Sequence, residues 1–276
     1  MIHETISLPV QYRNKGVKNN MFTPTLTTYI LDNYDEFSAL RKRPSVIICP
    51  GGGYARLSNR ETEAIAIKMN TLGFHALVLR YSVAPMDFPA ALLDAAEAMY
   101  YTRSHCKEWN IDENKIILCG FSAGGHLAAS LGVYWNSPLI TTYLPYKTEE
   151  VKPNGLLLCY PVITAGEYAH KDSIKNVLGK SSYTSQDVSL ELHITKDVPP
   201  VFMWHTDEDV TVPAENSLFF VQQLRQVGVP VEYHLFRKGR HGIALATEET
   251  STPDGYAVEK SCAIWPQLFS VWMETL

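Results

Sequence analysis

The sequence predicts an α/β fold in which a mainly parallel sheet is covered on both faces by helices. Short apolar segments alternate with longer helical segments from residue 45 onward, which is typical of βαβ units. The residues most suggestive of chemistry follow the ends of the apolar segments, where parallel sheets bind their ligands. At Lys115–Leu131 an apolar strand, a glycine-rich turn and a helix follow one another. We expect about eight strands, antiparallel at the N-terminal edge.

Length and charge limit the classes of function. A chain of 276 residues can form a single α/β domain, so we expect one domain over residues 1–276. Hydrophobic residues make up 46% and charged residues 19%, as in ordinary globular proteins. The net charge of −5 argues against nucleic acid or an anionic membrane as the main partner. No signal-peptide pattern is recognisable, so we expect a cytoplasmic protein, and a homo-oligomer stays open.

Cysteine and glycine patterns indicate neither a metal nor an organic cofactor. The five cysteines are odd in number and form no C-x-x-C pair. Cys49, Cys119 and Cys159 end apolar segments and are expected to be buried thiols. No phosphate-binding G-x-x-x-x-G-K-[ST] motif and no G-x-G-x-x-G motif opening a helix occurs.

The individual elements follow from local patterns. Two N-terminal segments alternate as half-buried strands, and five later segments read as strands of the sheet: Thr5–Tyr12, Thr25–Asp32, Ser45–Cys49, Ala76–Tyr81, Gly155–Tyr160, Val201–His205 and Val231–Phe236. The spacing Ser58-x-x-Glu61 has the form of a capping box and predicts a helix that ends at Gly73. Further helices are expected at Pro89–Cys106, Pro213–Val227 and Val258–Leu276.

Two segments interrupt the alternation, near residues 135–152 and 166–198. The first is aromatic and contains prolines, and the second is polar with two short helical pieces. We expect both to be lid-like insertions over the sheet. Their aromatic rings could contact a substrate or could pack on the protein itself, and the sequence favours neither interpretation.

The turn in Gly120-Phe121-Ser122-Ala123-Gly124 matches the G-x-S-x-G nucleophile elbow. In such a turn the serine has a strained backbone, and the glycines let the strand and the helix pass close together. The alternative is a glycine-rich turn that contains serine by chance, so the assignment depends on finding a base and an acid.

The expected base is His241, because it lies between glycine-rich neighbours after the last strand. A structural role is favoured for the remaining candidates His126, His170, His193, His205 and His234. Three carboxylates follow the strand that ends at His205. Asp209 fits best as the acid that orients the base, Asp207 is the runner-up and Glu208 is third.

Stabilising an oxyanion requires backbone N–H donors. The amide of Ala123 is one candidate, and the run Gly51-Gly52-Gly53 supplies the others. A phosphate-binding loop is the competing interpretation of the glycine run. Tyr54 directly follows the glycine run, and Tyr81 ends the expected strand Ala76–Tyr81. Both are expected to contact the substrate.

Five motifs carry a resemblance to a known superfamily: CPGGGY, LRYSVAP, CGFSAGGHLAA, PVFMWHTDEDVTVP and GRHGIALA, spread over residues 49–246. The chain resembles the α/β-hydrolase superfamily, in the esterase/lipase branch that includes acetylxylan esterase-like enzymes. Pro50 stands where that branch usually has the histidine of HGGG. The resemblance implies Ser122 as nucleophile, His241 as base, Asp209 as acid, and an oxyanion hole of Gly52, Gly53 and Ala123.

The resulting prediction is a serine carboxylesterase that hydrolyses short-chain, chiefly acetyl, esters through an acyl-enzyme. The expected partner is a small-molecule or oligosaccharide ester, and no cofactor is implied. An amide-cleaving enzyme of the peptidase or arylformamidase type is the first alternative. A non-catalytic scaffold of the same fold is the second.

Overall fold

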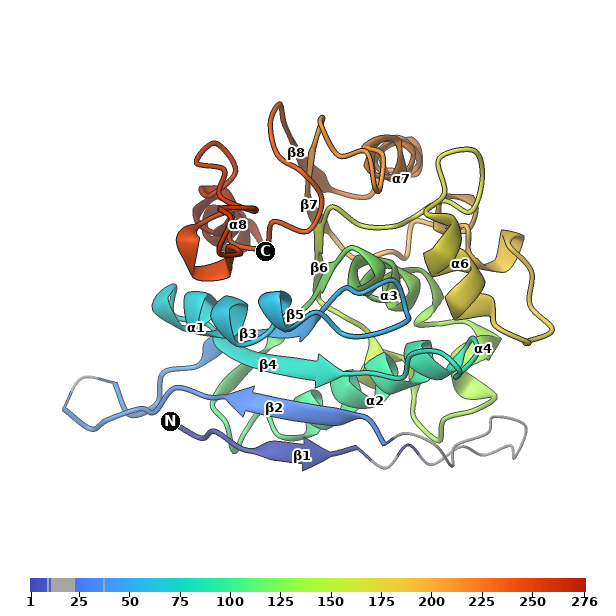
Figure 1. Ribbon diagram of the computed structural model, residues 1–276. Helices are drawn as coiled ribbons and strands as arrows, with labels where there is room; N and C mark the ends of the chain where they lie inside the picture. Colours follow the sequence, from blue (N-terminus) through green and yellow to red (C-terminus); the bar gives the residue numbers. More distant parts are fainter. Residues whose placement is uncertain (9, 11–22, 37) are drawn as a thin grey trace.

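The structure, a computed structural model, describes residues 1–8, 10, 23–36 and 38–276. At its centre is an eight-stranded sheet with the order β1-β2-β4-β3-β5-β6-β7-β8 (Figure 1). The strands are β1 (Thr5–Ser7), β2 (Thr25–Tyr29), β3 (Arg43–Cys49), β4 (His75–Arg80), β5 (Ile111–Phe121), β6 (Gly155–Cys159), β7 (Val201–Thr206) and β8 (Val231–Phe236).

Strand direction agrees with the prediction. β2 pairs antiparallel with both β1 and β4, and all other neighbours are parallel. The mainly parallel sheet with an antiparallel N-terminal edge is therefore confirmed. In the predicted segment Thr5–Tyr12 the strand covers only Thr5–Ser7, and residues 9, 11 and 12 lie outside the described part of the chain.

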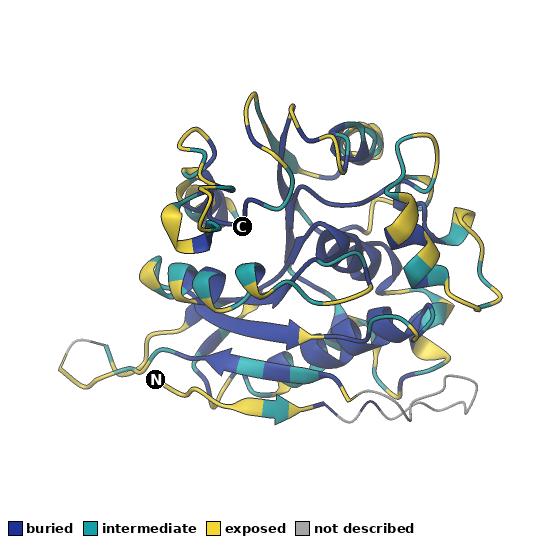
Figure 2. Cartoon of the chain, viewed as in Figure 1, coloured by how far each residue is buried: buried dark blue, intermediate teal, exposed yellow. Residues whose placement is uncertain are grey.

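The middle strands are apolar because they are buried on both faces. Every residue of β6 and β7 is buried, whereas β8 at the edge is half-exposed (Figure 2). Near-continuous apolar runs are expected where helices cover both faces of a parallel sheet. Burial thus explains why these strands lack the polar alternation of a one-sided sheet.

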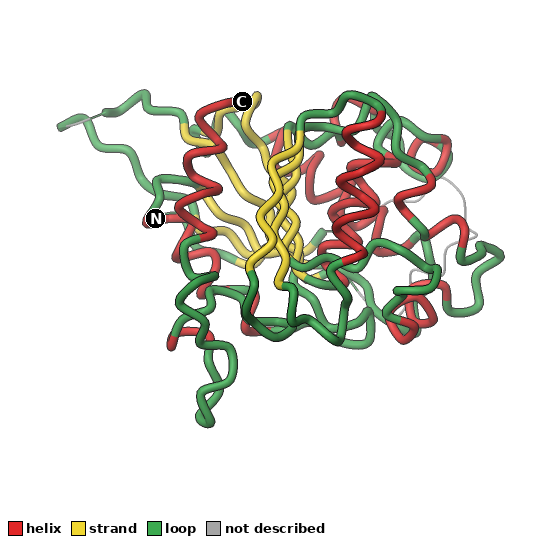
Figure 3. The backbone as a smooth tube through the Cα atoms, turned by 90° about the horizontal axis from the view of Figure 1, so that it is seen from above, coloured by secondary structure: helices red, strands yellow, loops and turns green. Residues whose placement is uncertain are grey.

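Helices cover the two faces in separate groups (Figure 3). One core contains side chains of α2 (Ala90–Ser104), α3 (Ala123–Tyr134) and α7 (Glu215–Gln226). The other contains those of α1 (Glu63–Thr71) and α8 (Trp265–Trp272). None of the helices in the described part of the chain is long and apolar enough to cross a membrane. All five cysteines are buried with free thiols.

The predicted capping box is wrong. A short 3₁₀ helix, η1 (Asn59–Glu61), precedes α1, and the Ser58 side chain makes no capping bond. Glu61 instead turns inward, where its carboxylate accepts hydrogen bonds from the Gly51 amide and the Tyr160 hydroxyl. Tertiary partners have replaced the local ones that the spacing suggested.

The predicted C-terminal helix begins too early. Residues 251–264 form turns, α8 starts at Trp265, and η5 (Met273–Thr275) follows it. Pro266 lies in the first turn of α8. Proline favours that position because its fixed φ suits a helix start and its missing N–H is not needed there.

The two segments expected to be insertions contain short helices: α4 (Pro138–Thr141) and α5 (Thr148–Val151) in the first, and α6 (Lys171–Leu178), η2 (Gln186–Val188) and η3 (Leu190–Leu192) in the second. Two aromatic side chains of the first segment pack on the protein itself. Tyr146 stacks on Tyr100 with 3.7 Å between ring centroids and donates a hydrogen bond to Glu97. The Trp135 indole donates to the Asp197 carbonyl at 3.0 Å. These contacts support the packing interpretation for both rings.

Candidate active site

Ser122 lies at a sharp turn between β5 and α3, with φ 54° and ψ −119°. This positive φ is costly for a residue with a side chain, as expected of a nucleophile elbow. A Cβ at position 120 would lie 2.0 Å from the Gly124 carbonyl oxygen. One at position 124 would lie 2.1 Å from the Cys49 carbonyl oxygen. Only glycine allows the strand, the helix and the end of β3 to approach so closely.

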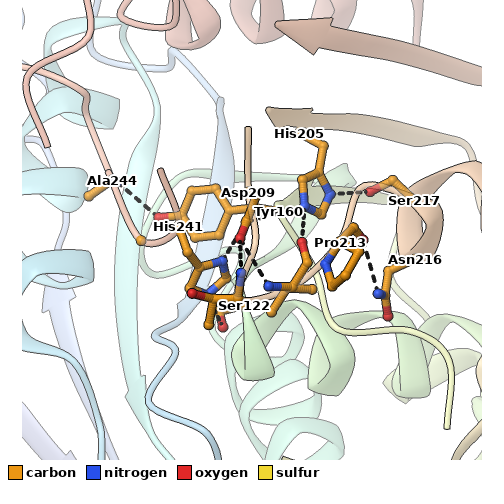
Figure 4. A network of polar contacts seen from close by, with 12 residues as sticks. Ser122, Tyr160, His205, Asp209, Pro213, Asn216, Ser217, His241 and Ala244 are labelled. Carbon is orange, nitrogen blue, oxygen red and sulfur yellow. Dashed lines mark hydrogen bonds and ion pairs between the residues drawn. The ribbon is translucent and has the colours of Figure 1, made fainter. Parts of the chain in front are cut away.

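The structure brings Ser122, His241 and Asp209 together at the carboxyl ends of the strands (Figure 4). The Ser122 hydroxyl oxygen lies 2.7 Å from His241 Nε2. His241 Nδ1 lies 2.6 Å from Asp209 Oδ2. An ionised carboxylate only accepts hydrogen bonds, so Nδ1 carries the proton and Nε2 is free to accept the serine proton.

Asp209 is the member of the acidic loop that contacts His241. Its Oδ1 accepts hydrogen bonds from the amides of Thr211 and Val212 at 3.0 and 2.9 Å. Burial raises the pKa of the Asp209 carboxyl, but the hydrogen bonds from His205 and His241 outweigh it and hold the pKa well below its usual value. The acid is therefore ionised at neutral pH.

The other two carboxylates of that loop take different positions. The Asp207 side chain is exposed, and the Asp207 amide donates to the Phe236 carbonyl. Glu208 Oε2 accepts a hydrogen bond from the Gly239 amide at 3.4 Å. Neither carboxylate has a hydrogen bond or ion pair with His241 among the described residues.

Two of the remaining histidines are buried beside the site. His205 Nε2 donates to the Val212 carbonyl at 2.9 Å and lies 3.4 Å from Asp209 Oδ2. His126 accepts from the Tyr54 hydroxyl and donates to the Val188 carbonyl. Both rings connect elements around the site, in agreement with the structural role expected for them.

The glycine run is held by its carbonyl groups. The carbonyls of Gly51, Gly52 and Gly53 accept hydrogen bonds from the Ser58 amide, the Ala55 amide and the Asn176 side chain, respectively. No described residue accepts from the amides of Gly52, Gly53 or Ala123. The carbonyls of the run are thus occupied by donors from the protein, whereas the amides of Gly52 and Gly53 can donate to a ligand. This arrangement suits anion binding.

The backbone conformation of the glycine run and its position beside Ser122 also suit anion binding. Gly52 and Gly53 have φ of 125° and 67°, which favour glycine. A Cβ at position 51 would lie 2.9 Å from the Ser122 Cβ, so the loop packs directly against the serine.

The expected substrate contacts Tyr54 and Tyr81 need correction, because both rings are buried in the core. The Tyr54 hydroxyl is bonded to His126, and the Tyr81 hydroxyl donates to the Pro50 carbonyl at 2.6 Å. They support the glycine loop from within. Tyr81 in particular holds the residue that stands in place of the HGGG histidine.

Four residues near the site were given no role there from the sequence: Glu61, Tyr160, His170 and Asn176. Asn176, on α6, binds the Gly53 carbonyl at 2.8 Å. His170 Cε1 lies 4.0 Å from where a Gly53 Cβ would be, and burial and the neighbouring His241 lower the pKa of its imidazole. The segment near residues 166–198 therefore borders the glycine loop. No local pattern distinguishes these residues, since their contacts span the chain.

A polar pocket of about 360 Å³ lies beside the His241 loop. Glu208, Arg240, Asp254 and Tyr256 contribute to its lining, whereas Ser122 and the glycine run do not. No group of three or more histidine, cysteine or acidic side chains in the described ranges could hold a metal ion.

A strained serine between a strand and a helix, bonded to a histidine that follows the last strand of the sheet, defines the α/β-hydrolase class. The BD-FAE family model matches residues 31–224, more than half of the chain. The chain therefore belongs to the BD-FAE family.

Individual relatives agree with this placement. The chain is 35% identical over 240 residues to endo-1,4-beta-xylanase B of Butyrivibrio fibrisolvens, covering 83% of this chain and 36% of the relative. It is 31% identical over 214 residues to the acetylxylan esterase of Xylanibacter ruminicola, covering 74% and 42%. It thus spans less than half the length of these two relatives.

A solved structure matches over nearly its whole length. The crystal structure of the acetyl ester-xyloside bifunctional hydrolase from Caldicellulosiruptor lactoaceticus has a TM-score of 0.80 and 35% identity to this chain. The match covers 99% of this chain and 96% of that one.

Proposed function

We propose that the protein is a serine carboxylesterase that removes short acyl groups, chiefly acetyl, from small-molecule or carbohydrate esters. The observation that carries the proposal is the continuous chain of hydrogen bonds from Ser122 through His241 to Asp209. A serine hydroxyl is a weak nucleophile at neutral pH, and this arrangement supplies both a base and the carboxylate that orients it.

The reaction follows from the positions of these groups. His241 Nε2 takes the Ser122 proton while the hydroxyl oxygen attacks the ester carbonyl carbon. The amides of Ala123, Gly52 and Gly53 stabilise the resulting oxyanion. The carbon–oxygen ester bond breaks, the alcohol leaves with the proton from His241, and an acyl-serine remains. Water then attacks the acyl-serine by the same steps and releases the carboxylic acid.

The acetyl and carbohydrate parts of the proposal rest on relatives. The names of the acetylxylan esterase and of the acetyl ester-xyloside hydrolase refer to acetyl esters and to xylose-containing substrates. The chain's own site agrees in chemistry, since an oxyanion hole and an activated serine suit carboxylic esters in general.

An ester panel tests the proposal. The substrates are aryl acetate, butyrate and octanoate together with acetylated xylo-oligosaccharides, and Ser122→Ala is the blank. We expect the acetate and acetylated oligosaccharides to be hydrolysed fastest. An aminoacyl anilide and N-formylkynurenine in the same panel test amide cleavage, and faster turnover of either would replace the esterase proposal.

A covalent probe tests for catalysis independently of substrate. A fluorophosphonate should label the parent protein and leave Ser122→Ala unlabelled. Absence of labelling in the intact parent would indicate a non-catalytic protein of this fold.

A further inference from the structure

A buried carboxylate, Glu61, connects the two loops that the proposed reaction needs. Its Oε2 accepts a hydrogen bond from the Gly51 amide at 2.7 Å, at the start of the glycine run. Its Oε1 accepts one from the Tyr160 hydroxyl at 2.8 Å. Burying a carboxylate is costly unless each oxygen has partners, and here both oxygens have one.

At the start of the glycine run, Glu61 and Tyr81 together hold one peptide group from its two sides. The N–H and C=O of a trans peptide point in opposite directions. In the Pro50–Gly51 peptide, the N–H binds Glu61 and the C=O binds the Tyr81 hydroxyl at 2.6 Å. The orientation of this peptide sets the direction in which the next amides, Gly52 and Gly53, enter the site.

At the other end, Tyr160 reaches the His241 loop. Its hydroxyl oxygen accepts a hydrogen bond from the Ala244 amide at 2.9 Å (Figure 4). Its ring packs edge-on against the His241 imidazole, with 5.2 Å between centroids. Tyr160 therefore holds both the backbone of this loop and the ring of the base.

The neighbouring residue on the same 3₁₀ helix adds a second attachment. Arg60 Nη1 donates to the Gly242 carbonyl at 3.0 Å, and its guanidinium lies over the Tyr256 ring. Burial raises the pKa of Glu61, while Tyr160, Gly51 and the charges of His241 and Arg60 oppose that rise. η1 thus contacts the glycine run and the His241 loop together.

We propose that Glu61 and Tyr160 are positioning residues that hold the oxyanion-binding amides and the His241 imidazole in one fixed arrangement. The proposal rests on the esterase function. In that reaction, the amides and the base must act on the same tetrahedral intermediate, so their relative position decides the rate. Displacements of about 1 Å are known to reduce turnover on the order of 100-fold.

The test uses Glu61→Gln, Tyr160→Phe and the double variant of the full chain. Glutamine offers one acceptor oxygen, so only one of the two donors, the Gly51 N–H or the Tyr160 O–H, keeps its acceptor. Phenylalanine removes the hydroxyl that joins Glu61 to Ala244 and keeps the ring beside His241. A matched control is the part-buried pair Tyr146 and Glu97, in which the Tyr146 hydroxyl donates to the Glu97 carboxylate at 2.7 Å. This pair belongs to neither of the two loops, and its variants are Tyr146→Phe, Glu97→Gln and the double variant.

The readouts are kcat and KM for an aryl acetate, with active sites counted by fluorophosphonate titration so that unfolded protein does not enter kcat. We expect each bridge variant to lose about 10- to 100-fold in kcat, with KM within about threefold of the parent. The double variant should lose little more than the worse single variant, because both changes break one bridge. The control variants should keep kcat per titrated site.

Three outcomes would overturn the inference: bridge variants with parental kcat per titrated site, multiplicative losses in the double variant, or equal losses in the controls. If Glu61→Gln does not fold, Tyr160→Phe decides the question, since it removes a single oxygen atom. A parent that neither hydrolyses esters nor reacts with the probe would instead refute the esterase function itself.

Discussion

His205 Nε2 lies 3.4 Å from Asp209 Oδ2, the same oxygen that lies 2.6 Å from His241 Nδ1. One carboxylate oxygen is therefore shared by two imidazoles, one from β7 and one from the loop after β8. His205 is fixed in turn by Ser217 at 2.7 Å and by the Val212 carbonyl. The acid is therefore held by amides of its own loop and lies beside His205 of β7, in addition to its contact with the base that it orients.

We expect Asp209→Asn to lower kcat by about 10,000-fold with little change in KM. Asparagine offers an N–H as well as an oxygen, so it can stabilise the wrong tautomer of His241 and cannot balance the charge of an imidazolium. Steady-state kinetics with an aryl acetate measures the effect. The control is Asp207→Asn on the same loop, which should stay within about threefold of the parent. Equal losses of kcat in both variants would show that Asp209 is not the acid that orients His241.

His205→Phe tests the neighbour of the acid. The change leaves the Val212 carbonyl and the Ser217 hydroxyl without the imidazole, which should cost about 1 to 3 kcal/mol in free energy of unfolding. Because Asp209 also loses a neighbour, kcat should fall on the order of 10-fold in protein that is still folded. Urea unfolding and titrated kinetics give the two values. His234→Phe, on the next strand, is the control, and a parental kcat in His205→Phe would show that His205 is purely structural.

Gly120→Ala should destabilise the fold strongly, because the new Cβ would lie 2.0 Å from the Gly124 carbonyl oxygen. Backbone cannot move aside as a flexible side chain can, so we expect a loss of at least about 3 kcal/mol. Chemical denaturation measures it. Gly166→Ala is the comparison, since its new Cβ would approach only the Thr164 hydroxyl, at 3.2 Å. Similar stability of the two variants would contradict the close approach at the elbow.

The buried carboxyl of Asp94 should make the stability of the protein depend on pH. Burial raises the pKa of its carboxyl to about 7 in the folded protein, against about 3.9 in an unfolded chain. Between these values the folded protein binds a proton that the unfolded chain has released. The contribution of Asp94 to the free energy of unfolding is therefore fully present below about pH 4 and is lost as the pH rises through about 7.

Asp94→Asn removes this titration. Relative to the parent, the variant should gain roughly 2 kcal/mol in free energy of unfolding between about pH 5.5 and about pH 8. Urea denaturation at the two pH values measures the change, and the exposed Asp35→Asn is the control. Parallel pH profiles for the parent and Asp94→Asn would show that Asp94 does not titrate in this range.

The features that sequence predicts well are those whose signal is local. The apolar strands predict a mainly parallel sheet, and the glycines around Ser122 predict the sharp turn, because only glycine allows the contacts they make. Asp209 is distinguishable from Asp207 through its place before Val212-Pro213. Each of these depends on a few adjacent residues.

The features that sequence misses depend on contacts between distant segments. Ser58 and Glu61 have the spacing of a capping box, but the Gly51 amide and the Tyr160 hydroxyl compete for the carboxylate. Tyr54 and Tyr81 lie in motifs that border the site, yet their rings are buried in the core. Packing across the chain decided these cases, and no single segment contains that information.

The backbone of Ser122 also has a consequence for selecting variants of this protein. Its φ of 54° and ψ of −119° suit glycine, whereas a residue with a Cβ bears strain on the order of 1 kcal/mol. Ser122→Gly should therefore melt at a higher temperature than the parent while losing the nucleophile. A screen that rewards heat resistance alone would enrich inactive molecules at this position, so directed evolution here needs an activity readout in every round.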